Sequence, residues 1–262
     1  MKMSPKRDVL IVVDAGNTQT VVGAYRGDEL AVHLRVSTTP ERTEDEYAAV
    51  LLDLLERRGI QASSAFGVMI ASVVPPLHDV FDRLARKHFG CTPLFLEPDT
   101  RTGLELGYDD PKAVGADRIA NALAAREVYG APAVVVDFGT ATTFDVLGAK
   151  GEYRGGIIAP GLGISADALF HRASRLQRVE IRRPEELVGR NTVEAVQSGL
   201  YFGYVGLVDG ILARLLDEVS GLTRVIATGG QAELIADGSR FITEVDPHLT
   251  LAGLKLIYEL NR

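Results

Sequence analysis

The chain has 262 residues, a formal net charge of −7 at pH 7 and 46% hydrophobic residues. At roughly 100 to 200 residues per domain, this length predicts one large domain or two small ones. The ordinary composition excludes disordered, collagen-like and disulfide-rich proteins, and a single cysteine cannot form an internal disulfide.

The distribution of charge and hydrophobicity predicts a cytoplasmic protein. The apolar run at residues 9–13 is too short for the core of a signal peptide, and no run approaches the ~18 to 20 uncharged apolar residues of a membrane span. Because 35 acidic side chains outnumber 28 basic ones, the overall field should repel nucleic acid and anionic membranes. We therefore expect no nucleic acid and no membrane among its partners.

The first third of the sequence predicts strands interrupted by helices. Thr43 begins a helical pattern that ends at Gly59, and Glu46 completes a capping-box signature three residues after Thr43. Apolar runs, alternation and turn residues predict the other elements. These are strands at residues 9–13, 20–25, 29–36, 67–73 and 93–96, and a helix at residues 77–88.

Two segments of the sequence repeat one pattern. Each has an apolar strand, then Asp-x-Gly with one or two threonines, then a second apolar strand. The first copy is Asp14-Ala15-Gly16-Asn17-Thr18, and the second is Asp137-Phe138-Gly139-Thr140 after the apolar residues 133–136. An apolar run at 225–227, a Gly-Gly turn and a helical pattern from Ala232 follow the second copy. The repeat predicts a duplicated α/β fold.

The repeated turns carry residue types that suit a phosphate and its metal ion. Glycine lets the main chain approach a ligand closely, and amides and hydroxyls can bond phosphate oxygens. The carboxylates of Asp14 and Asp137 would repel phosphate unless a cation or water lies between, which favours a metal–nucleotide complex. Ordinary Asx-turns use the same residues, but two copies at equivalent strand ends favour the functional interpretation.

Three further motifs accompany the two turns in a matching order and spacing. They are Gly115-Ala116-Asp117-Arg118, Gly155-Gly156-Ile157-Ile158-Ala159-Pro160-Gly161-Leu162 and Gly189-Arg190-Asn191-Thr192. With this set the sequence resembles the type III pantothenate kinase family, from about residue 9 to about residue 253. One departure is Ser174-Arg175-Leu176-Gln177, where the family commonly has Ala-Lys-Leu-Pro.

The resemblance implies an α/β fold of duplicated ribonuclease H-like domains, as in the acetate kinase/sugar kinase/Hsp70/actin superfamily. The N-terminal domain would span residues 1–118 and the C-terminal domain residues 119–262, with the active site in the cleft between them. The implied reaction is phosphorylation of pantothenate by ATP to 4′-phosphopantothenate, the first committed step to coenzyme A. The implied cofactors are a divalent metal such as Mg²⁺ and a monovalent cation, K⁺ or NH4⁺, and the implied assembly is a homodimer.

The resemblance also implies roles for individual residues. Asp117 would be the catalytic base, Asp137 would help bind the monovalent cation, and Thr140 would contact the nucleotide. The ATP phosphates would be held by Asp14, Ala15, Gly16, Asn17, Thr18, Gln19, Thr20 and Val21. Pantothenate would be bound by Tyr108, Gly115, Ala116, Asp117, Arg118 and Thr192.

The chemistry of pantothenate suits the pair Asp117 and Arg118. Pantothenate has a primary hydroxyl to be phosphorylated and a carboxylate at its far end, so a site needs a carboxylate at the first and a donor at the second. Asp117 would accept the hydroxyl proton late in a loose transition state, and Arg118 would bind the carboxylate with two parallel hydrogen bonds. The sequence alone also allows an aspartate that opens a helix at 119–128 beside a solvated arginine.

The segment after Asn191 also has two interpretations. Asn191 can cap a helix with Glu194 at the third position, which makes Thr192 ordinary first-turn sequence, although a helix start also suits an anion. A glycine stripe on the following helix predicts close packing against either a helix of the same chain or a second copy. The stripe consists of Gly199, Gly203, Gly206 and Gly210.

Other functions are compatible with parts of the sequence. Residues 161–166 match the dinucleotide fingerprint G-x-G-x-x-A, but Pro160 interrupts the entry and the preceding apolar run is short. No Walker A motif and no zinc-binding motif occurs. A non-catalytic regulatory relative, or a kinase for another small molecule, would share the fold. Intact Asp117, Arg118, Asp137 and Thr140 argue against the regulatory relative, and the motif from Gly115 to Arg118 argues against another substrate.

Overall fold

The computed structural model describes residues 7–173 and 176–262, so Ser174 and Arg175 of the departure noted above lie outside the described residues. The chain divides into two compact units. Unit 1 runs from the first described residues to Gly103 and includes Asp110–Ala124 and Thr250–Arg262, and unit 2 holds Leu104–Asp109 and Ala125–Leu249. Unit 1 therefore contains two segments, 119–124 and 250–262, that lie beyond the boundary expected after Arg118.

Unit 1 is built on a five-stranded sheet in the order β3-β2-β1-β4-β5. The strand β1 pairs antiparallel with β2 and parallel with β4. The strands are β1 (Val9–Ala15), β2 (Gln19–Arg26), β3 (Glu29–Ser37), β4 (Ala65–Ser72) and β5 (Leu94–Phe95). The helical segments are α1 (Glu44–Arg57), η1 (Ala62–Ser64), α2 (Leu77–Leu84), the π-helical η2 (Ala85–Phe89), η3 (Pro111–Ala113), the first part of α3 (Ala116–Tyr129) and most of α7 (Leu249–Asn261).

Unit 2 is built on a second five-stranded sheet in the order β10-β9-β6-β7-β8. The strand β6 pairs antiparallel with β7 and parallel with β9. The strands are β6 (Ala133–Phe138), β7 (Ala141–Leu147), β8 (Tyr153–Pro160), β9 (Arg224–Gly229) and β10 (Glu244–Val245). The helices that lie wholly in this unit are α4 (Leu162–Arg172), α5 (Thr192–Glu218) and α6 (Ala232–Ala236).

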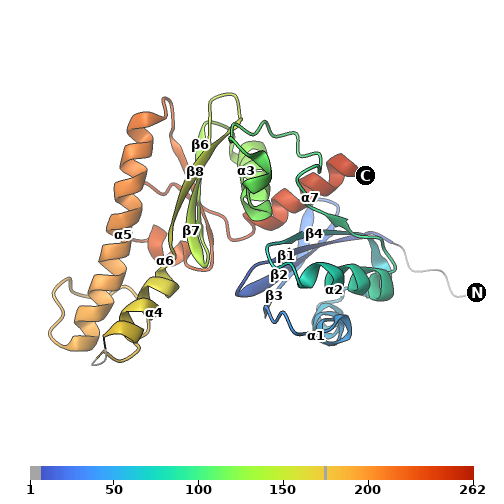
Figure 1. Cartoon of the computed structure of the whole chain (residues 1–262), viewed down its shortest axis with the longest axis horizontal. Helices are drawn as coiled ribbons and strands as arrows, with labels where there is room; N and C mark the ends of the chain where they lie inside the picture. The colour runs from blue at the N-terminus through green and yellow to red at the C-terminus, as the bar shows by residue number, and fades with distance from the viewer. Residues whose placement is uncertain (1–6, 174–175) are drawn as a thin grey trace, which may run out of the picture. The chain divides into compact units, whose positions relative to one another are not determined.

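The two sheets have the same topology, which confirms the duplicated α/β fold expected from the repeat. The strands β6, β7, β8, β9 and β10 take the places of β1, β2, β3, β4 and β5, with the same directions of pairing. Several strands of each sheet are labelled in Figure 1. Asp14 and Asp137 occupy equivalent positions, each one residue before the end of the first strand of its sheet.

The core of unit 1 lies between the sheet and the helices α1 and α2. Val9, Ile11 and Val13 alternate along β1, so their side chains share one face, and they lie in one buried cluster with residues of both helices. Tyr47 of α1 and Phe81 of α2 are fully buried in this cluster, with ring centroids 5.1 Å apart. This packing supports the strand that leads into the first repeated turn.

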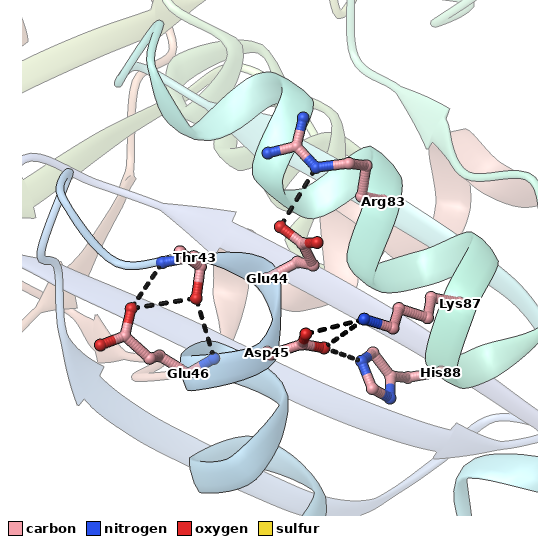
Figure 2. Close-up of polar contacts among 7 residues, drawn as sticks. All are labelled: Thr43, Glu44, Asp45, Glu46, Arg83, Lys87 and His88. Carbon is pink, nitrogen blue, oxygen red and sulfur yellow. Dashed lines mark hydrogen bonds and ion pairs between the residues drawn. The ribbon is translucent and has the colours of Figure 1, made fainter.

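The capping box predicted at Thr43 is confirmed. The Glu46 amide donates to the Thr43 hydroxyl at 3.4 Å, and the Thr43 amide donates to the Glu46 carboxylate at 2.8 Å (Figure 2). These bonds satisfy two amides that have no partner within the helix, so α1 begins at a defined residue.

Ion pairs connect the first turn of α1 to α2 and η2 (Figure 2). Arg83 donates to Glu44 at 3.1 Å, and Lys87 donates to Asp45 at 2.7 Å. The hydrogen bond from Lys87 lowers the pKa of Asp45 below its ordinary value, and a bond from His88 adds to the effect. A lowered carboxyl pKa adds to the free energy of unfolding at every pH above the ordinary carboxyl pKa. This contribution is lost as the pH falls through the lowered pKa.

The long helix α5 packs in the core of unit 2. Tyr201, Val208 and Leu212 are fully buried there. In length and composition α5 is the one described helix that could cross a membrane, but Glu194 and Asp209 interrupt it, so it holds no uncharged run long enough for the span considered in the sequence. The observation is weak evidence, because buried helices of soluble proteins pass the same test, and α5 carries Asp209 in an ion pair with Arg240 at 3.1 Å.

Tyr129 at the end of α3 provides a test of pH dependence in unit 2. Its hydroxyl donates to Asp246 at 3.1 Å, and burial together with the charge of Asp246 raises the pKa of Tyr129 to about 12. The raised pKa stabilises the fold fully below the ordinary tyrosine value near 10, and this contribution is lost as the pH rises toward the shifted value. The unaltered protein should therefore lose unfolding free energy as the pH rises from about 10 to about 12, and the Tyr129→Phe variant should lose less. Urea unfolding of both proteins at each pH measures this difference. Equal losses in both proteins would contradict the assignment.

Candidate active site

The first repeated turn joins β1 to β2 in unit 1. Asp14 is half-buried between β2 and β4, near the end of β1. The turn is closed by a hydrogen bond of 3.0 Å from the Gly16 amide to the Gln19 carbonyl. The exposed tip consists of Asn17, Thr18 and Gln19, and the buried flanking residues are Ala15 and Thr20. Thr20 is therefore a buried hydroxyl residue directly after the exposed tip of the turn.

The second repeated turn joins β6 to β7 in unit 2. Asp137 is half-buried and Thr140 is exposed at the tip. Gly229 has a φ of +89° at the end of β9, and a Cβ there would come within 2.5 Å of Asp137 Oδ1. The Gly161 amide donates to the Thr140 carbonyl at 3.2 Å, and a Cβ on Gly161 would collide with that carbonyl. Both positions therefore require glycine, one beside the carboxylate and one beside the tip.

Tyr204 of α5 connects β7, which follows the second turn, to the neighbouring strand β8. Its hydroxyl donates to the Pro160 carbonyl of β8 at 3.2 Å and accepts a hydrogen bond from the buried hydroxyl of Thr142 on β7. Burial raises the pKa of the Tyr204 hydroxyl above its ordinary value. Thr140 lies two residues before Thr142 in the chain, and its neighbour Gly161 directly follows Pro160.

Replacing Tyr204 by phenylalanine should lower the free energy of unfolding by about 1–3 kcal/mol, because the buried Thr142 hydroxyl and Pro160 carbonyl lose their shared partner. Tyr201 on the same helix is a matched control. Its hydroxyl is buried and has no hydrogen-bond partner among the described residues, so Tyr201→Phe should change stability by less than about 0.5 kcal/mol. Equal losses in urea unfolding of the two variants would show that the Tyr204 hydrogen bonds contribute nothing specific.

Asp117 and Arg118 lie at the start of α3 in unit 1. Asp117 Oδ1 accepts a hydrogen bond of 2.8 Å from the Arg118 amide. A Cβ on Gly115 would come within 2.6 Å of the same oxygen, so glycine lets the carboxylate lie this close to the backbone. Asp117 is half-buried, and Arg118 is only 7% exposed. This low exposure of Arg118 does not fit the alternative of an arginine on a solvated helix face.

Tyr108 and Thr192 belong to unit 2. The half-buried ring of Tyr108 lies 6.3 Å from the ring of Tyr153 on β8. Asn191 caps α5 by accepting a hydrogen bond of 3.0 Å from the Glu194 amide, which confirms the expected cap. Thr192, next to this cap, is exposed and lines an open groove of about 670 Å³ between α4 and α5. Thr192 is therefore a residue of the first helical turn, as the cap at Asn191 predicts, and its side chain is exposed.

The sequence-predicted residues form a few local groups. Unit 1 holds the Asp14 turn and the Gly115-Ala116-Asp117-Arg118 helix start, and unit 2 holds Asp137 with Thr140 on one hairpin. Each group combines a half-buried carboxylate with glycine at a close approach. Tyr108 and Thr192 lie outside the unit 2 hairpin.

The residues near Asp137 suit a cation. No group of three or more His, Cys, Asp or Glu side chains that could hold a metal ion occurs in the part of the chain that the structure describes. Asp137 nevertheless offers a hard oxygen donor, and glycine at position 229 lets this carboxylate lie close to the backbone. This donor chemistry fits a hard cation that completes its shell with ligand or water oxygens.

Sequence reasoning missed three residues that shape these turns: Thr38, Tyr204 and Gly229. The Gly-Gly turn after the apolar run at 225–227 is a visible signal for Gly229. Thr38 carries a weaker signal as a hydroxyl residue just after a predicted strand. Tyr204 carries none, because its partners Thr142 and Pro160 are far away in the sequence.

The dinucleotide fingerprint at residues 161–166 lacks its required context. It follows β8, an edge strand that pairs antiparallel with β7, whereas a dinucleotide site opens a parallel βαβ unit. The structure therefore argues against an oxidoreductase.

Comparison with solved structures identifies the fold. A Baf family transcriptional activator from Campylobacter jejuni has a TM-score of 0.58 at 20% identity, covering 96% of this chain and 98% of that protein. The inorganic polyphosphate/ATP-glucomannokinase of Arthrobacter sp. strain KM has a TM-score of 0.50 at 17% identity, covering 97% and 99%. Together with the two sheets of equal topology, these similarities confirm the fold of duplicated ribonuclease H-like domains.

Comparison with known sequences identifies the family. The model of the type III pantothenate kinase family matches residues 10–214, which include both repeated turns and the start of α3. A type III pantothenate kinase from Anaeromyxobacter sp. (strain Fw109-5) is 50% identical over 254 residues, covering 97% of this chain and all of the relative. With this identity over nearly the full length, the chain belongs to the type III pantothenate kinase family.

Proposed function

We propose that Asp117 is the base in the reaction of this family, in which ATP phosphorylates pantothenate to 4′-phosphopantothenate, the first committed step to coenzyme A. Phosphoryl transfer has a loose transition state, so the enzyme mainly positions the reactants and neutralises charge. The carboxylate of Asp117 orients the primary hydroxyl and accepts its proton late, as the bond to phosphorus forms. The observation that carries this role is the half-buried Asp117 carboxylate at the start of α3, where Gly115 lets Oδ1 lie close to the backbone.

Arg118 then binds the carboxylate at the far end of pantothenate. A guanidinium offers two parallel donors to a carboxylate, and the low exposure of Arg118 strengthens such a pair by limiting its contact with water. Gly115 and Ala116 supply the backbone beside the substrate, and Tyr108 and Thr192 complete the pantothenate site.

The two repeated turns hold ATP. The segment from Asp14 to Val21 binds the phosphates through its turn, and Thr140 contacts the nucleotide from the second hairpin. Asp14 would hold Mg²⁺ through water, because its carboxylate would otherwise repel the phosphates, and the bound ion would neutralise phosphate charge.

Asp137 helps to bind a monovalent cation, K⁺ or NH4⁺. Support comes from the half-buried Asp137 carboxylate, a hard oxygen donor near the end of β6 that Gly229 allows to lie close to the backbone. The test measures formation of 4′-phosphopantothenate from ATP and pantothenate with Mg²⁺, in potassium or ammonium and in sodium. We expect the unaltered protein to turn over in potassium or ammonium and much more slowly in sodium, and the Asp137→Asn variant to show no such difference between the salts. Equal rates of the unaltered protein in all three salts would refute the cation site.

We further propose a homodimer that uses the exposed face of α5. Val193 is 48% exposed and Leu207 is 37% exposed on this helix. A Cβ on Gly199, Gly203 or Gly206 would meet nothing within 4 Å, so the glycine stripe does not pack against another part of the described chain. A second copy would cover this apolar face.

The cytoplasmic location expected from the sequence stays a prediction.

A further inference from the structure

Thr38, just after the end of β3, bonds both sides of the first repeated turn. Its hydroxyl donates to the Gly16 carbonyl at 2.7 Å, and its amide donates to the Thr18 carbonyl at 3.0 Å. The Thr20 hydroxyl lies 2.9 Å from the Thr38 hydroxyl. Because a threonine hydroxyl has one proton and that of Thr38 is used on Gly16, Thr20 is the donor in this contact. Thr38 thus connects to three residues of the turn.

These bonds fix the orientation of two peptide groups in the turn. A trans peptide is planar, so the carbonyl of one residue and the amide of the next point in opposite directions. The carbonyls of Gly16 and Thr18 point toward Thr38, and the amides of Asn17 and Gln19 consequently point away from it. An anion approaching from the side away from Thr38 would meet amide donors, with those two carbonyl dipoles turned from it.

Thr38 is itself held by the core of unit 1. The neighbouring residue Thr39 donates its amide to the Tyr47 hydroxyl at 2.9 Å, and the Tyr47 hydroxyl donates to the Thr39 carbonyl at 3.2 Å. Tyr47 is fully buried against Phe81. On the other side, Ser37 ends β3 in register with Gln19 of β2. The segment that carries Thr38 is therefore anchored at both neighbours.

We infer that Thr38 is a positioning residue for binding the phosphate chain of a nucleoside triphosphate, acting by holding the Gly16 and Thr18 carbonyls away from the ligand. The inference rests on the proposed role of the Asp14 to Val21 segment in binding ATP. Thr38 acts through the turn and needs no contact with the ligand. Loss of its hydroxyl frees the Gly16 carbonyl and removes the partner of the buried Thr20 hydroxyl, so the turn should lose its fixed geometry.

The test compares Thr38→Val, which has nearly the same shape without the hydroxyl, with Thr38→Ser, which keeps it. Thr38→Val should raise the KM for ATP roughly tenfold, the size expected for one lost hydrogen bond, with a smaller effect on the KM for pantothenate. Thr38→Ser should restore most of the ATP affinity. Thr39→Val is the matched control, because Tyr47 bonds the main chain of Thr39, and its KM for ATP should equal that of the unaltered protein.

An Asp14→Asn variant separates failure of the inference from failure of the ATP assignment. If Asp14→Asn raises the KM for ATP and Thr38→Val does not, the inference is overturned while the assignment stands. If neither variant changes it, the assignment of the turn fails and the inference fails with it. A lower melting temperature of Thr38→Val without a change in KM, or equal losses in Thr38→Val and Thr38→Ser, would also overturn the positioning role.

Discussion

Asp117→Asn is expected to lower kcat by about 10²- to 10⁴-fold, the range that a positioned general base contributes. The amide has nearly the shape of the carboxylate, and its oxygen can still accept the hydrogen bond of the Arg118 amide, so the start of α3 should keep its structure. Steady-state kinetics with saturating ATP and pantothenate would measure the loss, and circular dichroism would check the fold.

The matched control for this variant is Glu127→Gln, which removes a negative charge from the exposed face of the same helix. Its kcat should stay within about twofold of the unaltered protein, because exposed charges interact weakly with distant groups. An Asp117→Asn protein that turns over as fast as the control would remove Asp117 as the base.

Arg118→Ala is expected to raise the KM for pantothenate roughly 100-fold, with a much smaller change in the KM for ATP. Truncating one partner of a buried charge pair typically costs about 2–5 kcal/mol of binding energy, and Arg118 is only 7% exposed. Arg118→Lys keeps the charge but loses the two parallel donors, so its KM should lie between those of the other two proteins.

Pantothenol, which has an alcohol in place of the pantothenate carboxylate, provides the control for Arg118. If Arg118 acts on the carboxylate, the KM for pantothenol should be high in the unaltered protein and little changed by Arg118→Ala. An unaltered KM for pantothenate in Arg118→Ala would remove the carboxylate role. Equal increases for both compounds would assign the loss to general disruption of the helix start.

The duplicated fold was predictable because each sheet begins with an apolar strand and a turn of the same residue types. Asp14 and Asp137 mark these turns in the sequence, and the structure places them at equivalent strand ends. The helix α1 was predictable from its capping box at Thr43. In each case the signal lies within a few neighbouring residues, where local hydrogen bonds decide the structure.

The helix α7 was not predicted, although it completes unit 1. Leu249, Leu251, Leu254 and Ile257 are all buried, so the helix has no clear polar face to show a period of 3.6. A Cβ on Gly253 would collide with the backbone of Ala120 on α3, which shows how closely these helices pack. A helix of this kind depends on packing between segments that are distant in the sequence, and no local sequence pattern indicates that packing.

The candidate site shows the same division between local and distant information. Asp117, Arg118 and the two turns stand in compact motifs, so a single sequence identifies them. The burial of Arg118, and the contacts that Thr38 and Tyr204 make with these turns, depend on strands and helices that meet only in the folded chain. Hydroxyl residues of this kind are common on surfaces, and only their partners distinguish them.

The most direct test of the account is whether the purified protein converts pantothenate and ATP to 4′-phosphopantothenate, detected by mass spectrometry, in the presence of Mg²⁺ and K⁺. The account predicts ATP-dependent product with the phosphate on the primary hydroxyl, and almost none from Asp117→Asn protein that still binds ATP. Absence of product from a folded protein that binds ATP would contradict it, as would product formed equally well by Asp117→Asn.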